Sequence, residues 1–214
     1  MDGRPWTVDD RPQTADHRPQ KAAELHAFLR SRRSIRRFKT EPVPEDLLHR
    51  LLETAIHAPS AHNLQPWRFV LVQNATARER LGRALTDKMR ADMEAEGALE
   101  TDIAARVERS LRRLSEAPVV LLFCRDTAAV RDDTPEEHHM GVQSVANAVT
   151  YLLLAAHAEG LGGNWICWPL YAPAETRAAL NLPAAWQPEG MLFLGWPDET
   201  PGEKTLRAVE VVRR

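Results

Sequence analysis

An arginine-rich run near the start of the chain, Arg30-Ser-Arg-Arg-Ser-Ile-Arg-Arg37, combines five arginines with two serines. Guanidinium groups match the oxygen geometry of phosphates and carbonyls, and a serine hydroxyl adds a short hydrogen bond. In an extended segment Arg32, Ser34 and Arg36 point to one side. Three convergent polar groups predict a site for one elongated, phosphorylated ligand. A solvated basic turn is the alternative that composition alone leaves open.

A second polar cluster follows in the run Pro59-Ser-Ala-His-Asn-Leu-Gln-Pro-Trp67. Because prolines bracket it, this run must be a loop. The apolar strand expected directly after it would make the loop a rigid platform for side-chain amides and hydroxyls. An ordinary connection, in which Ser60 and Asn63 satisfy neighbouring backbone groups, explains the same residues equally well.

Other motifs do not match their chemistry. The run Gly160-Leu-Gly-Gly163 follows a helix and precedes a strand, the reverse of the order that a dinucleotide-binding turn needs, so it indicates a helix end. Neither the pair His57 and His62 nor the adjacent histidines 138–139 have the i, i+4 spacing of helical metal ligands, and no metal site is expected.

Composition narrows the class of protein further. The 214 residues carry a net charge of −2, which gives no general attraction to nucleic acid. No apolar run approaches the roughly 20 residues that span a bilayer, so no membrane association is expected. Two cysteines cannot build a disulfide framework. We therefore expect a globular, cytoplasmic protein.

The pattern along the chain predicts one α+β domain over residues 21–214. Residues 1–20 contain three prolines and few apolar groups, and are expected to form a mobile leader. A helix over 138–159 is apolar nearly all round from Val145 and needs cover on every side, for example from a second subunit. The other helices are expected over 21–29, 44–58, 76–114 with a break near Gly97, and 173–180. Strands are expected over 67–72, 118–124, 164–167, 191–195 and 209–212.

Three runs together resemble the FMN-dependent nitroreductase family in residue type, order and spacing. They are Arg32-Arg-Ser-Ile-Arg-Arg-Phe38, the 58–67 loop, and Gly160-Leu-Gly-Gly-Asn-Trp-Ile-Cys167. The charged segment 88–114 is similar to the C-terminal flavin domain of deazaflavin coenzyme glutamate ligases. The resemblance implies a three-layer α/β/α sandwich, with a mixed sheet of four to five strands flanked by helices, in an intertwined homodimer.

The resemblance also implies how FMN is bound. The first run would contact the flavin pyrimidine edge, ribityl chain and phosphate, and the loop would reach the flavin from the other subunit. The third run would lie along the side from the dimethylbenzene ring to N5, and two basic residues near the C-terminus would close on the phosphate. The expected FMN-binding residues are Arg32, Arg33, Ser34, Arg36, Pro59, Ser60, Ala61, Asn63, Gln65, Ile166, Cys167, Trp168, Lys204 and Arg207.

The activity implied is ping-pong hydride transfer from NADH or NADPH, through flavin N5, to a small organic acceptor such as a nitroaromatic or a quinone. His62 is the one local candidate for a general acid. The segment 88–114 and the region of Trp165 and Trp168 are expected on the acceptor side. Reduction of a deazaflavin coenzyme precursor and flavin binding without turnover stay open as alternatives. The sequence identifies neither the acceptor nor the preferred nicotinamide donor.

Overall fold

The computed structural model describes residues 22–214, which fall into two units, residues 22–32 and residues 33–214. The leader expected over residues 1–20 lies outside the described residues. The first unit is helix α1 (Ala22–Ser31) with the residue after it, and no residue of α1 is buried. Within residues 22–214, no helix is long and apolar enough to cross a membrane.

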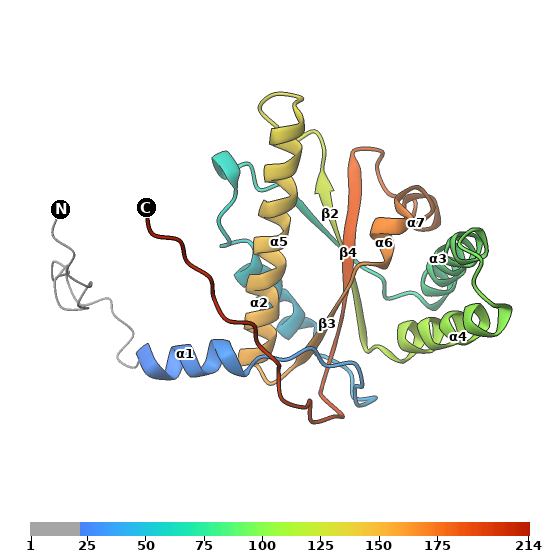
Figure 1. The fold of residues 1–214 in the computed structure, drawn as a ribbon, viewed down its shortest axis with the longest axis horizontal. Coiled ribbons are helices and arrows are strands. Elements are labelled where there is room, and N and C mark those ends of the chain that lie inside the picture. Colours follow the sequence, from blue (N-terminus) through green and yellow to red (C-terminus); the bar gives the residue numbers. More distant parts are fainter. Residues whose placement is uncertain (1–21) are drawn as a thin grey trace, which may run out of the picture. The chain divides into compact units, whose positions relative to one another are not determined.

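The second unit is built on a four-stranded sheet (Figure 1) of β1 (Trp67–Leu71), β2 (Val119–Asp126), β3 (Gly162–Ile166) and β4 (Trp186–Gly195). The strand order is β1-β2-β4-β3, so β1 and β3 form the edges, and every strand pairing is antiparallel. The resemblance implied a mixed sheet of four to five strands, and the described residues form an antiparallel sheet of four. The parallel pairing among the described residues is one isolated bridge between Ser34 and Gly163.

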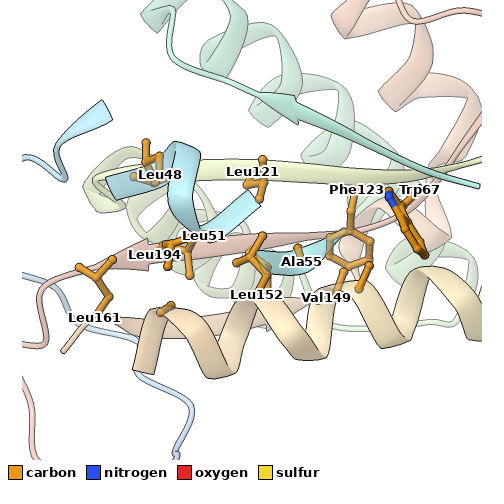
Figure 2. Packing of buried hydrophobic residues seen from close by; sticks show 14 of the residues in the cluster. Leu48, Leu51, Ala55, Trp67, Leu121, Phe123, Val149, Leu152, Leu161 and Leu194 are labelled. Atoms are coloured by element: carbon orange, nitrogen blue, oxygen red, sulfur yellow. The ribbon is translucent and has the colours of Figure 1, made fainter. Parts of the chain in front are cut away.

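Helices α2 (Glu45–Ala55) and α5 (Pro135–Ala158) cover one face of this sheet. In α2 the apolar residues recur every three or four positions, which gives the helix one buried stripe. Figure 2 shows that stripe meeting α5 and the inward side chains of the central strands. The best-buried members of this cluster are Leu51, Ala55, Leu121, Phe123, Ala148, Val149, Leu152, Leu192 and Leu194.

The other face of the sheet packs against α3 (Ala75–Ala95), α4 (Glu100–Glu116), α6 (Trp168–Tyr171) and α7 (Pro173–Leu180). Gly97 has a φ of +77° between α3 and α4, a conformation that glycine adopts without strain. Because β2 is buried on both faces, its continuous apolar run is that of a central strand. The three-layer α/β/α sandwich is confirmed.

Several local expectations were wrong. The helix expected from residue 76 begins one residue earlier, at Ala75, because the side chain of Asn74 caps it by accepting a hydrogen bond from the Ala77 amide. The strand expected over 209–212 is absent, and residues 196–214 contain no helix or strand longer than an isolated bridge. The run from Gly160 to Gly163 was expected to be a helix end, but β3 begins at Gly162, so Gly162 and Gly163 belong to the strand and Gly160 ends the helix. Helix α5 leaves Tyr151 40% exposed in the single chain.

Candidate functional site

The segment after Arg32 lies against the beginning of β3. The Ile35 amide donates a hydrogen bond to the Gly163 carbonyl at 3.1 Å, and the Ile35 side chain is 7% exposed. Gly162 makes this approach possible, since a Cβ there would lie 2.6 Å from the Ile35 Cβ. Ile35 is buried, Ser34 is half-buried, and Arg36 and Arg37 are both exposed. The convergence of Arg32, Ser34 and Arg36 on one side stays a prediction.

The same segment is also fixed by Glu199, which the sequence did not single out. The Glu199 carboxylate accepts hydrogen bonds from the backbone amides of Arg36 and Arg37 and pairs with Arg37 Nε at 3.3 Å. The Arg36 amide is the largest cause that holds the pKa of Glu199 below its usual value. Arg37 is thus engaged by Glu199, whereas the Arg36 guanidinium has no hydrogen-bond partner among the described residues.

The loop over residues 59–66 is held by α5. The Ala61 amide donates to Ser144 Oγ at 3.1 Å, and Asn147 Nδ2 donates to the Pro59 carbonyl at 3.2 Å. Ser144 is only 2% exposed, and its hydroxyl donates in turn to the Met140 carbonyl at 2.7 Å. These two α5 side chains position the loop, and sequence reasoning missed both because they lie about eighty positions away in the chain.

Inside the loop, the polar side chains organise one another. Ser60 Oγ accepts from the Gln65 amide at 3.2 Å, and Asn63 Oδ1 accepts from Gln65 Nε2 at 3.0 Å. His62, Asn63 and Gln65 have φ values of 52°, 55° and 49°, in the left-handed region that costs non-glycine residues energy. Local bonding by Ser60 and Asn63 agrees with an ordinary connection. Three strained residues in one short loop favour a function instead.

His62 lies at the outer side of this loop. Its Nε2 is 3.4 Å from a carboxylate oxygen of Glu137, and its Nδ1 is 3.4 Å from a guanidinium nitrogen of Arg131. Both ring nitrogens therefore already face charged groups of the same chain. The role of His62 as a general acid stays a prediction.

One chain does not bring all the predicted residues together. Ser34 and Ile166 lie beside or within β3, three residues apart in register, or about 10 Å along the strand. The 59–66 loop leads instead into β1, at the opposite edge of the sheet, three strand spacings or about 14 Å away. Arg32 belongs to the other unit, and Lys204 and Arg207 are exposed in the irregular C-terminal segment.

A cavity of about 510 Å³ opens beside the end of β3. Its walls come from α3, α4, β3 and α6, including the segment and the tryptophans that the sequence placed on the acceptor side. Cys167 is exposed at this cavity, and Ile166 and Trp168 line it on either side. The indole Nε1 of Trp168 is buried without a hydrogen-bond partner among the described residues.

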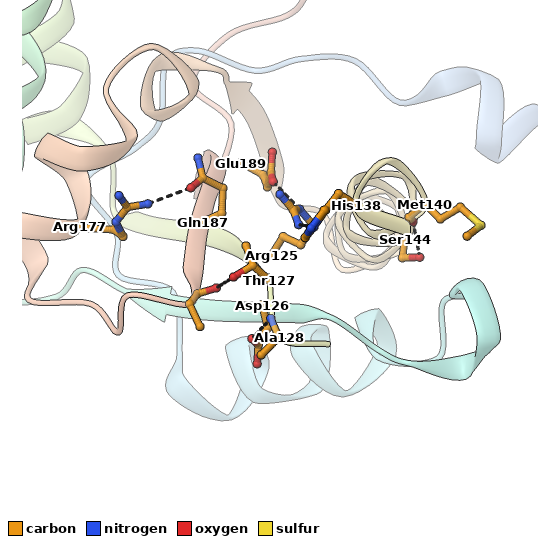
Figure 3. A network of polar contacts seen from close by, with 11 residues as sticks. Arg125, Asp126, Thr127, Ala128, His138, Met140, Ser144, Arg177, Gln187 and Glu189 are labelled. Atoms are coloured by element: carbon orange, nitrogen blue, oxygen red, sulfur yellow. Dashed lines mark hydrogen bonds and ion pairs between the residues drawn. The ribbon is translucent and has the colours of Figure 1, made fainter. Parts of the chain in front are cut away.

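A polar network at the neighbouring end of the sheet was not anticipated. Arg125 Nε pairs with Glu189 at 2.9 Å, both side chains being about one-tenth exposed, and the Arg125 guanidinium contacts His138 Nδ1 at 2.8 Å (Figure 3). Gly141 leaves room for this arginine, because a Cβ there would lie 2.8 Å from it. Burial raises the pKa of Glu189, and Arg125 opposes that rise. The network ties β2, β4 and α5 together near the loop-bearing end of α5.

Comparison with known proteins places the chain in a family. The nitroreductase family profile matches residues 29–196. A protein of Rhodospirillum rubrum named 5,6-dimethylbenzimidazole synthase is 36% identical over 89% of this chain and 93% of its own length. An NADH dehydrogenase of Thermus thermophilus is 33% identical over 78% of this chain and 84% of its own length. A Desulfovibrio desulfuricans structure, described as a nitroreductase in complex with FMN, is 26% identical, with a TM-score of 0.66 over 85% of this chain and 92% of that one.

The family profile covers more than half of the chain, and it includes all three runs on which the resemblance rested. The fold agrees with that result, since the helical layers and the sheet match a solved structure that contains FMN. The prediction made from the sequence is confirmed: the chain belongs to the nitroreductase family of oxidoreductases.

Proposed function

We propose that this protein is a homodimeric, FMN-dependent oxidoreductase that takes hydride from NADH or NADPH and delivers it to a small organic acceptor. The observation that carries the proposal is the placement of two predicted groups along β3. Ser34 and Arg36 lie beside its beginning, and Ile166 to Trp168 follow from its end, next to a cavity. A relative named NADH dehydrogenase and a structural neighbour with bound FMN support the donor and the cofactor.

The residues present fit FMN in chemistry and length. The phosphate is the anionic end, and the Arg36 guanidinium, which no described residue engages by a hydrogen bond, would meet it or the ribityl chain together with Ser34. Ile166 lies about 10 Å further along β3, and the orphaned Nε1 of Trp168, at the start of α6 just beyond it, would meet a polar atom of a bound group. An elongated ligand with one phosphate fits this arrangement better than a compact anion does.

The sheet order supports the homodimer. The strained loop with Ser60, Asn63 and Gln65 leads into one edge strand, while the rest of the proposed site lies at the other edge. A second copy placed against the β3 side would supply the loop that the first copy cannot reach. Val142 and Tyr151 of α5, 39% and 40% exposed in the single chain, are available to be covered in such a dimer.

FMN, when bound, supplies two-electron chemistry at its N5 atom. The chain's own residues would hold and orient it: the positive charge of Arg36 favours negative charge on a neighbouring flavin or phosphate oxygen. The walls of the cavity would shield the acceptor from water and hold it beside the end of β3. No protein nucleophile is required. Both cysteines, Cys124 and Cys167, are free in the structure.

The test is the retention of FMN by an arginine double variant. Arg32→Ala with Arg36→Ala should abolish FMN binding while the protein stays a folded dimer, as checked by circular dichroism and light scattering. The matched control, Arg109→Ala with Arg112→Ala, removes the same charge from exposed positions of α4 and should bind FMN normally. Stoichiometric FMN in the first variant would show that the site lies elsewhere.

A second candidate is the synthesis of 5,6-dimethylbenzimidazole, favoured by the 36% identical relative of that name. The two candidates differ in product. Protein with FMN and a nicotinamide donor should reduce an added nitroaromatic or quinone in the first case. In the second case, 5,6-dimethylbenzimidazole should appear in the mixture by mass spectrometry. A yellow protein that no nicotinamide reduces would instead favour flavin binding without turnover.

A further inference from the structure

The geometry points to an acceptor class: a planar aromatic compound that carries an anionic group, held by Arg106, Ser110 and Arg113 of α4. This inference rests on the proposed function, in which the cavity beside β3 receives the acceptor. It goes further, because the sequence placed the segment 88–114 on the acceptor side without naming a binding residue or the chemistry of the acceptor.

The cavity has one aromatic side. Trp165, Trp168 and Tyr171, from β3 and α6, line it together with Phe193 of β4. Flexible methionines of α3, at positions 89 and 93, line it as well. Aromatic faces and adaptable thioethers favour a flat, polarisable ring over a sugar or an aliphatic chain.

The opposite wall carries the charge. Helices α3 and α4 lie side by side (Figure 1), and the positions 106, 110 and 113 of α4 share one helical face because they are four and three residues apart. Arg113 is half-buried and Arg106 is exposed, and neither has an ion-pair or hydrogen-bond partner among residues 22–214. Both guanidinium groups are therefore available to pair with an anionic group in the cavity.

The remaining charges of the cavity do not cancel these arginines. Lys88 pairs with Asp92 one turn further along α3, so this pair is internally neutral. Glu96, exposed near the end of α3, is the one other acidic residue in the lining. Two arginines against one carboxylate leave a net positive wall that faces an aromatic one. A ring bearing a carboxylate or phosphate complements both walls at once.

The experiment compares two probes of matched shape, 4-nitrobenzoate and the uncharged 4-nitrobenzyl alcohol. Binding to the oxidised, FMN-loaded protein is measured by calorimetry, and reduction is measured as kcat/KM. We expect the wild type to favour the carboxylate by at least tenfold, as a charge-assisted hydrogen bond predicts. Arg113→Gln and Arg106→Gln should each reduce that preference several-fold, with little effect on the alcohol.

The control is Arg109→Gln, which removes the same charge from a residue of α4 that does not line the cavity. It should keep the full preference for the carboxylate. Equal affinities of the two probes in the wild type, or equal losses in Arg109→Gln and Arg113→Gln, would overturn the inference. A change confined to the ratio of NADPH to NADH use would overturn it too, because the arginines would then bind the donor. Probe binding measured by calorimetry does not depend on turnover. If the proposed function is wrong, the flavin will not bleach with a nicotinamide donor, and this result is distinct from a loss of the preference for the carboxylate.

Discussion

Ser144 is the residue through which the core of α5 holds the strained loop, and its replacement tests that connection. Ser144→Ala removes the acceptor of the Ala61 amide at 3.1 Å and the donor to the Met140 carbonyl at 2.7 Å. An amide left without a partner costs about 1–3 kcal/mol, and the better helix propensity of alanine returns about 0.5 kcal/mol. We expect the free energy of unfolding to fall by about 0.5–2.5 kcal/mol.

The same change should weaken FMN binding, because the loop carries Ser60 and Gln65. If the less ordered loop reduces the binding free energy of FMN by about 1.4 kcal/mol, the Kd rises tenfold. Unfolding in urea and fluorescence titration with FMN measure the two effects.

Thr150→Ala is the matched control for this variant. Its hydroxyl makes the same kind of bond, to the Ala146 carbonyl at 2.9 Å on the same helix, but does not contact the loop. The control should keep its stability and its FMN affinity. Equal free energies of unfolding and equal FMN affinities for Ser144→Ala and Thr150→Ala would show that Ser144 does not hold the loop.

Three further predictions concern stability and reactivity. The Arg78 guanidinium donates hydrogen bonds to the carbonyls of Val72, Ala117 and Pro118, at 2.7–3.0 Å. Arg78→Met should therefore lower the free energy of unfolding, measured in urea, by about 2–4 kcal/mol. A variant that unfolds like the wild type would contradict this. Cys167 is exposed, whereas burial raises the pKa of Cys124 to about 12. Native protein should therefore react rapidly with one equivalent of a thiol reagent at pH 8. Rapid reaction of two equivalents would contradict this. Burial raises the pKa of Glu189 in the folded state, so its stabilising contribution is complete below its ordinary pKa of 4.5 and falls as the pH rises through the folded value. The free energy of unfolding of the wild type, measured in urea, should therefore fall relative to that of Glu189→Gln as the pH rises above about 4.5. A wild type that becomes more stable relative to Glu189→Gln over the same range would exclude this.

The sequence predicted those parts of the fold whose causes are local. The buried stripe of α2, the prolines that bracket the 59–66 loop and the break at Gly97 depend on neighbours within a few residues, and the structure confirms each. The first residue of α3 was misplaced by one position because Asn74 and Thr76 are both suitable N-cap residues, and which of them caps the helix depends on where β1 ends. The strand expected at 209–212 had suitable residues but no neighbouring strand to pair with in this chain.

The candidate site divides in the same way. The positions beside β3 were found because their motif is continuous in sequence. Ser144, Glu199 and Glu189 were missed because each is an ordinary polar residue that becomes important only through a distant partner. The sheet order was also beyond the sequence, and it places the 59–66 loop and the positions beside β3 at opposite edges of the sheet, which is the basis on which we propose a second chain.

An anaerobic titration with a nicotinamide donor shows whether this chain is a flavin oxidoreductase. Protein loaded with FMN and freed of excess flavin is mixed with NADH or NADPH while its absorbance near 450 nm is followed. We expect a yellow protein with one FMN per chain, whose flavin band bleaches with one equivalent of donor and returns when an acceptor is added. A colourless protein that takes up no FMN would contradict it.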